Sequence, residues 1–345
     1  MLSAFFYPFI RAVRCFKYSR QSIVVNRKHL FLLLLLGVTH SQLFSQCCSG
    51  GVPISGTIGL GTNDKHSWNF LITQDYNVLQ QLFEGASKLN DNKRKRVTNS
   101  TLIETNYGLT NKITLSSIFS FINQKREINT ISNLSNTTST SGIGDAVLLL
   151  KYRIKQITLN QSHGLIVGIG PKLPLGKSNI HNDSGIILPA DLQPGTGAWD
   201  FLIWGLYQKA NLFTKNLTGT LAISFRKTGI NREYFGSQQY QFGNELMVNL
   251  QSNYRFIIKS HMYSGTLALR YRNQHEDYIN GENFPNSGGN FVFLNPSLSL
   301  YLTPKFLLTT GAYIPVYQNV GGTQLATSYK LLFSLSYTLT NNKNN

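Results

Sequence analysis

Charged side chains in this sequence stand at alternate positions along several apolar segments. Asp145, Lys151 and Arg153 occupy odd positions, and the even positions between them hold only apolar residues. A period of two places neighbouring side chains on opposite faces of a β-strand. Charges that share a face can form ion pairs or line a passage for solutes. Eleven charges follow this pattern: Lys151, Arg153, Arg226, Arg255, Arg270, Arg272, Lys330, Glu104, Asp145, Asp200 and Glu245.

If the strands enclose a lumen, these eleven charges have two possible roles. Lone buried charges are costly, so the charges can pair in ladders that stiffen the wall. Alternatively, a surplus of positive charge can form a constriction that favours anionic solutes. Asp145 and Asp200 begin their segments, whereas Arg226, Arg270 and Arg272 end theirs. In antiparallel strands these ends lie at similar heights, so we expect ion pairs among them.

The elements that must position these charges are twelve segments in which apolar and polar residues alternate. They are longer than the roughly 5–6 residues of ordinary strands and match membrane strands of about 9–11 residues with extensions into water. A soluble β-sandwich would alternate too, but with shorter strands. We therefore expect an all-β fold, a transmembrane antiparallel up-and-down β-barrel of about twelve strands. The segments are 66–77, 96–108, 112–123, 142–155, 162–173, 196–209, 216–228, 239–255, 262–274, 291–302, 305–317 and 324–340.

The connections between these segments alternate in length, as outer loops and periplasmic turns do in bacterial barrels. The long ones lie near 78–95, 124–141, 174–195, 229–238 and 275–290. The stretch from Lys177 to Pro194 either folds inward as a constriction or remains an exposed loop. Twelve strands give a bore between the filled eight-stranded and the open sixteen-stranded cases, so we expect a narrow path.

The amino-terminal residues have the pattern of an export signal. Arg27 and Lys28 precede an apolar run, 29–38, which is followed by small and polar residues. The run is too short for a spanning helix, which needs about 20 apolar residues. We expect a leader and signal peptide at 1–45, a periplasmic segment at 46–65, an outer-membrane barrel at 66–340 and a polar tail at 341–345.

The net charge and its distribution limit the kinds of partner that the sequence predicts. The formal charge is +17, and the part after residue 45 carries 26 basic and 15 acidic residues. These charges are scattered among strands and no nucleic-acid recognition motif is present, so nucleic acid is not an expected partner. We expect the outer-membrane bilayer and a small solute as partners, and the sequence does not indicate an oligomeric state.

Residues with catalytic or metal-binding chemistry do not form a constellation in this sequence. The histidines after the leader, His66, His163, His181, His261 and His275, are scattered, and no nucleophile motif accompanies them. Cys47 and Cys48 could bind a soft metal, but an exposed pair that oxidises is the commoner case. We therefore expect neither enzymatic activity nor a cofactor.

Four short segments carry a resemblance to a known family. They are the turn Tyr107 to Lys112, then Ser141 to Asp145, Gly170 to Gly176, and Leu192 to Asp200. In their order and spacing they resemble the outer-membrane family labelled meta-pathway of phenol degradation, whose members are called transporters. The resemblance implies a barrel with a transport or uptake role. The phenol link belongs to the family label.

The sequence thus favours an outer-membrane channel that passes small solutes, anionic or aromatic, by passive diffusion. Two other functions stay open. One is a structural or adhesive barrel that acts through its loops, and the other is an outer-membrane lipid hydrolase, which the scattered histidines disfavour.

Overall fold

The structure is a computed structural model that describes residues 61–91, 93–131 and 134–340. Its strands are β1 (Trp68–Glu84), β2 (Ser87–Leu89), β3 (Arg94–Gly108), β4 (Ile113–Ile131), β5 (Leu134–Lys155), β6 (His163–Leu173), β7 (Asp200–Lys209), β8 (Leu217–Lys227), β9 (Asn231–Phe235), β10 (Gln238–Gln241), β11 (Glu245–Ile258), β12 (His261–Gln274), β13 (Asp277–Ile279), β14 (Glu282–Phe284), β15 (Gly289–Tyr301), β16 (Phe306–Val320) and β17 (Thr323–Leu339). A single 3₁₀ turn, η1 (Ala190–Leu192), is described among them.

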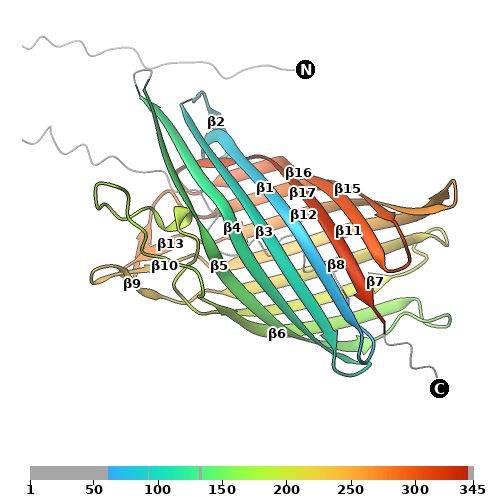
Figure 1. Ribbon diagram of the computed structural model, residues 1–345. Helices are drawn as coiled ribbons and strands as arrows, with labels where there is room; N and C mark the ends of the chain where they lie inside the picture. Colours follow the sequence, from blue (N-terminus) through green and yellow to red (C-terminus); the bar gives the residue numbers. More distant parts are fainter. Residues whose placement is uncertain (1–60, 92, 132–133, 341–345) are drawn as a thin grey trace, which may run out of the picture. The chain divides into compact units, whose positions relative to one another are not determined.

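Twelve of these strands form a closed antiparallel barrel (Figure 1). Each pairs with its neighbour in chain order, and β1 pairs with β17 to close the ring, with Trp68 opposite Leu339. Closure leaves no free sheet edge, so every strand has partners for its backbone groups on both sides. The predicted fold and strand number are confirmed.

The barrel wall has a buried inner face and an exposed apolar outer face. On β7, Leu202 and Trp204 point inward and are 1% exposed, whereas Phe201 and Ile203 point outward and are 47% and 50% exposed. Inward and outward side chains alternate in the same way along the other barrel strands, because the side-chain period is two. Exposed apolar residues on this scale fit a belt that contacts lipid.

Aromatic side chains gather near the end of the barrel where the turns are short. Trp68 lies 4.4 Å from Tyr107 between ring centroids, and Phe306 lies 4.4 Å from Tyr337. These rings stand at the β1, β3, β16 and β17 strand ends, as expected for a membrane–water interface.

Long connections meet at the other end and form a cap. Strands β9 and β10, between β8 and β11, pair with β13 and β14, between β12 and β15, in a separate four-stranded sheet. Tyr234, Tyr240 and Phe242 from this sheet region pack against Ala190 of the β6–β7 connection. Apolar contact thus joins three connections that are distant in sequence.

Several strand boundaries differ from the sequence prediction. Strand β1 continues to Glu84 and pairs with β2, within the stretch 78–95 that was predicted to be a loop. Strands β4 and β5 continue to Ile131 and from Leu134, whereas 124–141 was predicted to be a loop. The extension is held by backbone pairing, from Lys125 opposite Thr140 to Ile131 opposite Leu134. The predicted strand 239–255 is divided into β10 and β11 around Gly243.

Among the described residues, no helix is both long and apolar enough to cross a membrane. The predicted leader and most of the predicted periplasmic segment lie outside the described residues. So do the polar tail and the pair Cys47 and Cys48.

Candidate functional site

Asp145 holds together three of the segments that carry the family resemblance, at the long-loop end of the lumen. Its carboxylate accepts hydrogen bonds from the backbone N–H of Gly176 (3.2 Å) and from the backbone N–H and hydroxyl of Thr196 (3.0 and 2.7 Å). Lys172 Nζ lies 3.0 Å from the same carboxylate. The backbones of Gly176 and Gly195 approach too closely for a Cβ at either position. The glycine-rich segments therefore serve to fold the β6–β7 connection onto Asp145.

A chain of ion pairs extends from Asp145 around the wall. Its members come from six successive barrel strands, β5, β6, β7, β8, β11 and β12. The distances are 3.0 Å for Lys172 to both Asp145 and Asp200, 3.9 Å for Arg226–Asp200, 3.7 Å for Arg226–Glu245 and 2.7 Å for Arg272–Glu245. Signs alternate along the chain, so three cations balance three anions. Of the five charges expected to pair with one another, Asp200 and Arg226 do so, whereas Asp145 pairs with Lys172, Arg272 pairs with Glu245, and Arg270 has no carboxylate within 4.0 Å among the described residues.

A second ionic cluster joins β17, the last barrel strand, to β1, the first. Lys330 of β17 lies 2.5 Å from Asp75 of β1, and both groups face the lumen. Lys330 Nζ also lies 5.5 Å from the centroid of the Tyr313 ring, on β16. The guanidinium of Arg270 covers the same ring at 4.7 Å. Tyr313 thus stands between two cations, of which Lys330 has a carboxylate partner.

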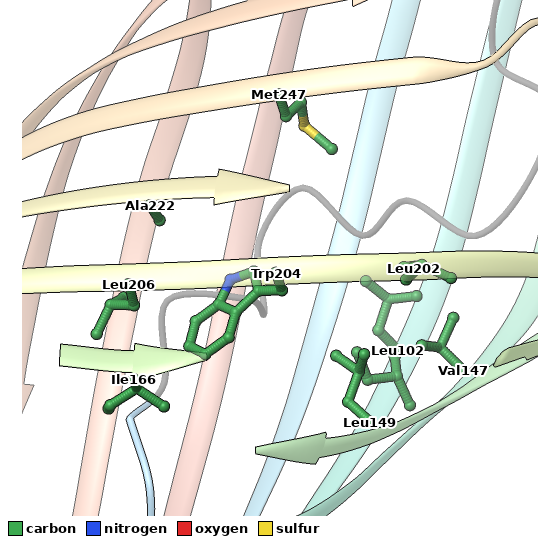
Figure 2. Close-up of a cluster of buried hydrophobic side chains, with 10 residues drawn as sticks. Leu102, Val147, Leu149, Ile166, Leu202, Trp204, Leu206, Ala222 and Met247 are labelled. Carbon is green, nitrogen blue, oxygen red and sulfur yellow. The ribbon is translucent and has the colours of Figure 1, made fainter. Parts of the chain in front are cut away.

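Apolar side chains fill the part of the lumen beside strands β3 to β8. Figure 2 draws these residues as sticks, with all but Ile118 labelled, and shows them extending from several strands into the interior. Lys151 and Glu104 are buried at the edge of this cluster, 3.8 Å apart. Lys151 Nζ also lies 5.2 Å from the Trp204 ring centroid. The cluster consists of Leu102, Ile118, Val147, Leu149, Ile166, Leu202, Trp204, Leu206, Ala222 and Met247.

Residues just before β1 enter the lumen from the short-turn end. Arg153 donates to the carbonyl oxygen of Thr62 (2.9 Å) and lies 3.3 Å from the Asp64 carboxylate. The Asn63 backbone N–H donates to the Thr114 hydroxyl at 2.9 Å. Arg153 therefore anchors the chain that precedes the barrel. Arg255, also on the lumen face near this end, is exposed.

The β6–β7 connection has an exposed first part and a buried second part. Residues 188, 190–196 and 198 are buried, and they lie against the inner faces of β3, β4 and β5. Asp191 pairs with Arg96, and Lys125 Nζ donates to the Gln193 carbonyl oxygen at 2.6 Å. The inward alternative for this stretch therefore holds for its second part.

A pocket in the lumen lies mainly beside β8 to β17. It is a cavity of about 200 Å³. Its border is made of hydroxyl and amide side chains, a few apolar side chains and one arginine, Arg270: Trp204, Ala222, Ile223, Ser224, Met247, Asn249, Gln251, Thr266, Arg270, Asn295, Ser297, Ser299, Thr309, Gly311, Tyr313, Leu332 and Ser334. Phe291 and Phe293 pack with Tyr313 in an apolar cluster next to this cavity.

Several lumen residues were not found from the sequence. Lys172 lies in the segment Gly170 to Gly176, from which only a family resemblance was taken. Its even position on β6 nevertheless places it inside the barrel. Asp75 and Lys125 have the same kind of signal, namely a charge at the inward parity of a strand. Trp204 carries no such signal, because an inward apolar residue interrupts the polar pattern.

Among residues 61–340, apart from 92, 132 and 133, no group of three His, Cys, Asp or Glu residues is arranged to hold a metal ion. The histidines in this part of the chain are dispersed, with His66 bonded to Tyr107 and His163 beside Tyr207 at strand ends.

The comparisons with known proteins bear on the barrel. No protein-family model matches this sequence, and no curated protein matches it. Among solved structures, the COG4313 outer membrane channel from Pseudomonas putida F1 is similar, with a TM-score of 0.64, 15% identity, and coverage of 84% of this chain and 100% of that one. The NanC porin (TM-score 0.42, 10% identity, coverage 78% and 100%) and the KdgM porin (0.38, 11%, 78% and 99%) are more distant. The first likeness shows a shared fold.

Proposed function

We propose that this chain is an outer-membrane channel through which small solutes diffuse passively. The observation that carries the proposal is the pairing of an exposed apolar belt outside with a polar-lined cavity inside. The belt suits lipid, and the cavity offers hydroxyl and amide partners to a hydrated solute. The protein with the shared fold is itself described as an outer membrane channel. Short turns face the periplasm in bacterial barrels, so the long-loop end, with its cap, faces the cell exterior.

The arrangement of charges supports passage. Every ion pair in the chain from Asp145 to Arg272 joins adjacent strands, so the pairs follow the wall and do not bridge the lumen. Paired charges of this kind brace a barrel at little cost to its bore. The chain is neutral as a whole, and so is the Asp75–Lys330 pair. Arg270 adds positive charge beside the cavity, and from it we infer a modest preference for anions.

The test is conductance of the full-length, purified and refolded protein in planar bilayers. We expect discrete unitary steps, and under a salt gradient a reversal potential that favours anions. Arg270→Ser should abolish that preference, while Lys227→Ser, on the outer face, should leave it unchanged. Protein that is folded by its heat-shifted gel mobility yet shows neither conductance nor liposome swelling would overturn the proposal.

The cap favours a second candidate, a barrel that acts through its exterior connections. The four-stranded sheet of β9, β10, β13 and β14 is an ordered surface that a simple pore does not need. Liposome swelling separates the two candidates, because a barrel that serves only to display its cap does not admit solutes such as arabinose.

A further inference from the structure

Arg270 differs from most other lumen cations in its partners; in the part of the chain that the structure describes, the other two without a nearby carboxylate are Lys125, which donates to the Gln193 carbonyl oxygen, and Arg255, which is exposed. Lys151, Lys172, Arg226, Arg272 and Lys330 each lie within 4.0 Å of a carboxylate. Within the described ranges of the chain, no carboxylate lies that close to Arg270. Its Nε and Nη1 atoms have no hydrogen-bond partner among the described residues, although they are shielded from solvent. Unsatisfied buried donors cost free energy, and a guanidinium is a strong donor to carboxylates.

The surroundings of Arg270 have two kinds of surface. Trp204, Met247 and Leu332 border the cavity on its apolar side, Trp204 with only 1% of its surface exposed, and the Tyr313 ring lies under the Arg270 guanidinium. An anion that is bound here would thus meet a cation at one end and apolar surface along its body.

The size of the cavity sets the scale of the ligand. A volume of about 200 Å³ suits a molecule with a single ring or a short branched chain and excludes long acyl chains and sugars of several units. A purely hydrophilic ion would leave the apolar surface of Trp204 and Met247 unused. A neutral apolar molecule would leave the Arg270 donors unsatisfied.

We propose that the cavity beside Arg270 is a binding site for a small organic carboxylate with an apolar body. The carboxylate accepts hydrogen bonds from the Arg270 guanidinium, which turns toward the cavity on the Tyr313 ring. The apolar body packs against Trp204, Met247 and Leu332. This inference rests on the proposed function, because it names the class of solute that the channel selects.

The probes are sodium benzoate, benzyl alcohol as its neutral counterpart, and sodium acetate as an anion without an apolar body. Binding to the detergent-solubilised full-length protein is measured by equilibrium dialysis at constant chloride. We expect benzoate to bind at least about tenfold more tightly than either of the others, as a charge-assisted hydrogen bond in a shielded site provides. Arg270→Gln should remove that advantage. Arg232→Gln, the same change at an exposed cap residue, should keep it.

Conductance is measured in parallel, so that the two proposals can fail separately. Benzoate should reduce the unitary conductance of the wild-type channel as it occupies the cavity, and not that of Arg270→Gln. Conductance with equal affinity for benzoate and benzyl alcohol would overturn this inference and leave the channel standing. Selective binding of benzoate without conductance or swelling would overturn the channel and leave the binding site standing. If Arg270→Gln does not fold, the wild-type preference for benzoate over benzyl alcohol decides alone.

Discussion

Strands β3 to β8 line one half of the lumen, and strands β11 to β17 with β1 line the other. In the first half, inward positions hold large apolar residues such as Leu102, Leu149 and Trp204, which pack into one buried cluster. In the second half, the same parity holds Asn249, Ser297 and Thr309 around a cavity. The backbone is the same in both halves, so the side chains at inward positions decide where the barrel is filled and where it is open.

The difference separates two tasks that one wall must meet. The filled half resembles a protein core and supplies stability from apolar burial. The open half confines apolar burial to the cluster around Phe291, Phe293 and Tyr313 and places polar groups around the cavity. A change that affects conductance should therefore lie in the open half, and a change that affects stability should lie in the filled half.

The largest expected effect comes from obstruction of the open half. Ser299→Trp places an indole in the cavity, and we expect unitary conductance to fall by roughly fivefold or more, since pore diameter limits flow. Leu298→Trp puts the same side chain on the outer face of the same strand and should leave conductance unchanged. If Leu102→Ala, in the filled half, raises conductance as much as Ser299→Trp lowers it, the division of the lumen is wrong.

The next effect concerns the ion-pair chain at the rim of the filled half. Lys172→Ala removes the cation that Asp145 and Asp200 share, and its side chain is fully buried. We expect the free energy of unfolding to fall by about 3–5 kcal/mol, as for a buried pair that loses one partner. Denaturant unfolding in lipid vesicles measures it. The exposed Lys177→Ala should change stability by less than about 0.5 kcal/mol.

The smallest effect concerns the cap, which joins the connections of both halves. Burial raises the pKa of Asp277, although hydrogen bonds from the Tyr240 hydroxyl (2.5 Å) and the Gly243 N–H (2.7 Å) partly oppose this. The folded cap therefore binds a proton more tightly than the unfolded chain. Its stability should fall as pH rises from the ordinary Asp value near 3.8 through the raised pKa.

Hydrogen–deuterium exchange, corrected for its intrinsic pH dependence, measures the opening of 231–241 and 277–284 across that range. Asp277→Asn keeps a hydrogen-bonding side chain but does not titrate, so it should flatten the pH dependence. The exposed Asp183→Asn should retain the wild-type profile, and a wild-type cap that becomes more protected as pH rises would contradict the sign.

The fold could be predicted from the sequence because side chains that face lipid must be apolar, and they occupy every second position of a strand. That period located all twelve barrel strands and gave the inward parity of charges such as Arg226 and Glu245. The filled half could not be predicted, because Leu102 and Trp204 interrupt the polar pattern and carry no sign of which neighbour they meet. The buried part of the β6–β7 connection was equally hidden, since contacts such as Asp191 with Arg96 join residues without any local periodicity.

The alternating chain from Asp145 to Arg272 also bears on how the barrel assembles. Each ion pair joins neighbouring strands, and a slip of one residue in any pairing would turn a charged side chain from water to lipid. A lipid-facing Arg or Lys in a barrel wall costs about 2–4 kcal/mol at the bilayer centre and about 0–1 kcal/mol near its interfaces, so a slip at this end of the barrel carries a smaller penalty. The chain of ion pairs therefore favours the correct strand register. At β6, β7, β8 and β11, a misaligned neighbour loses an ion pair and also exposes a charge to lipid.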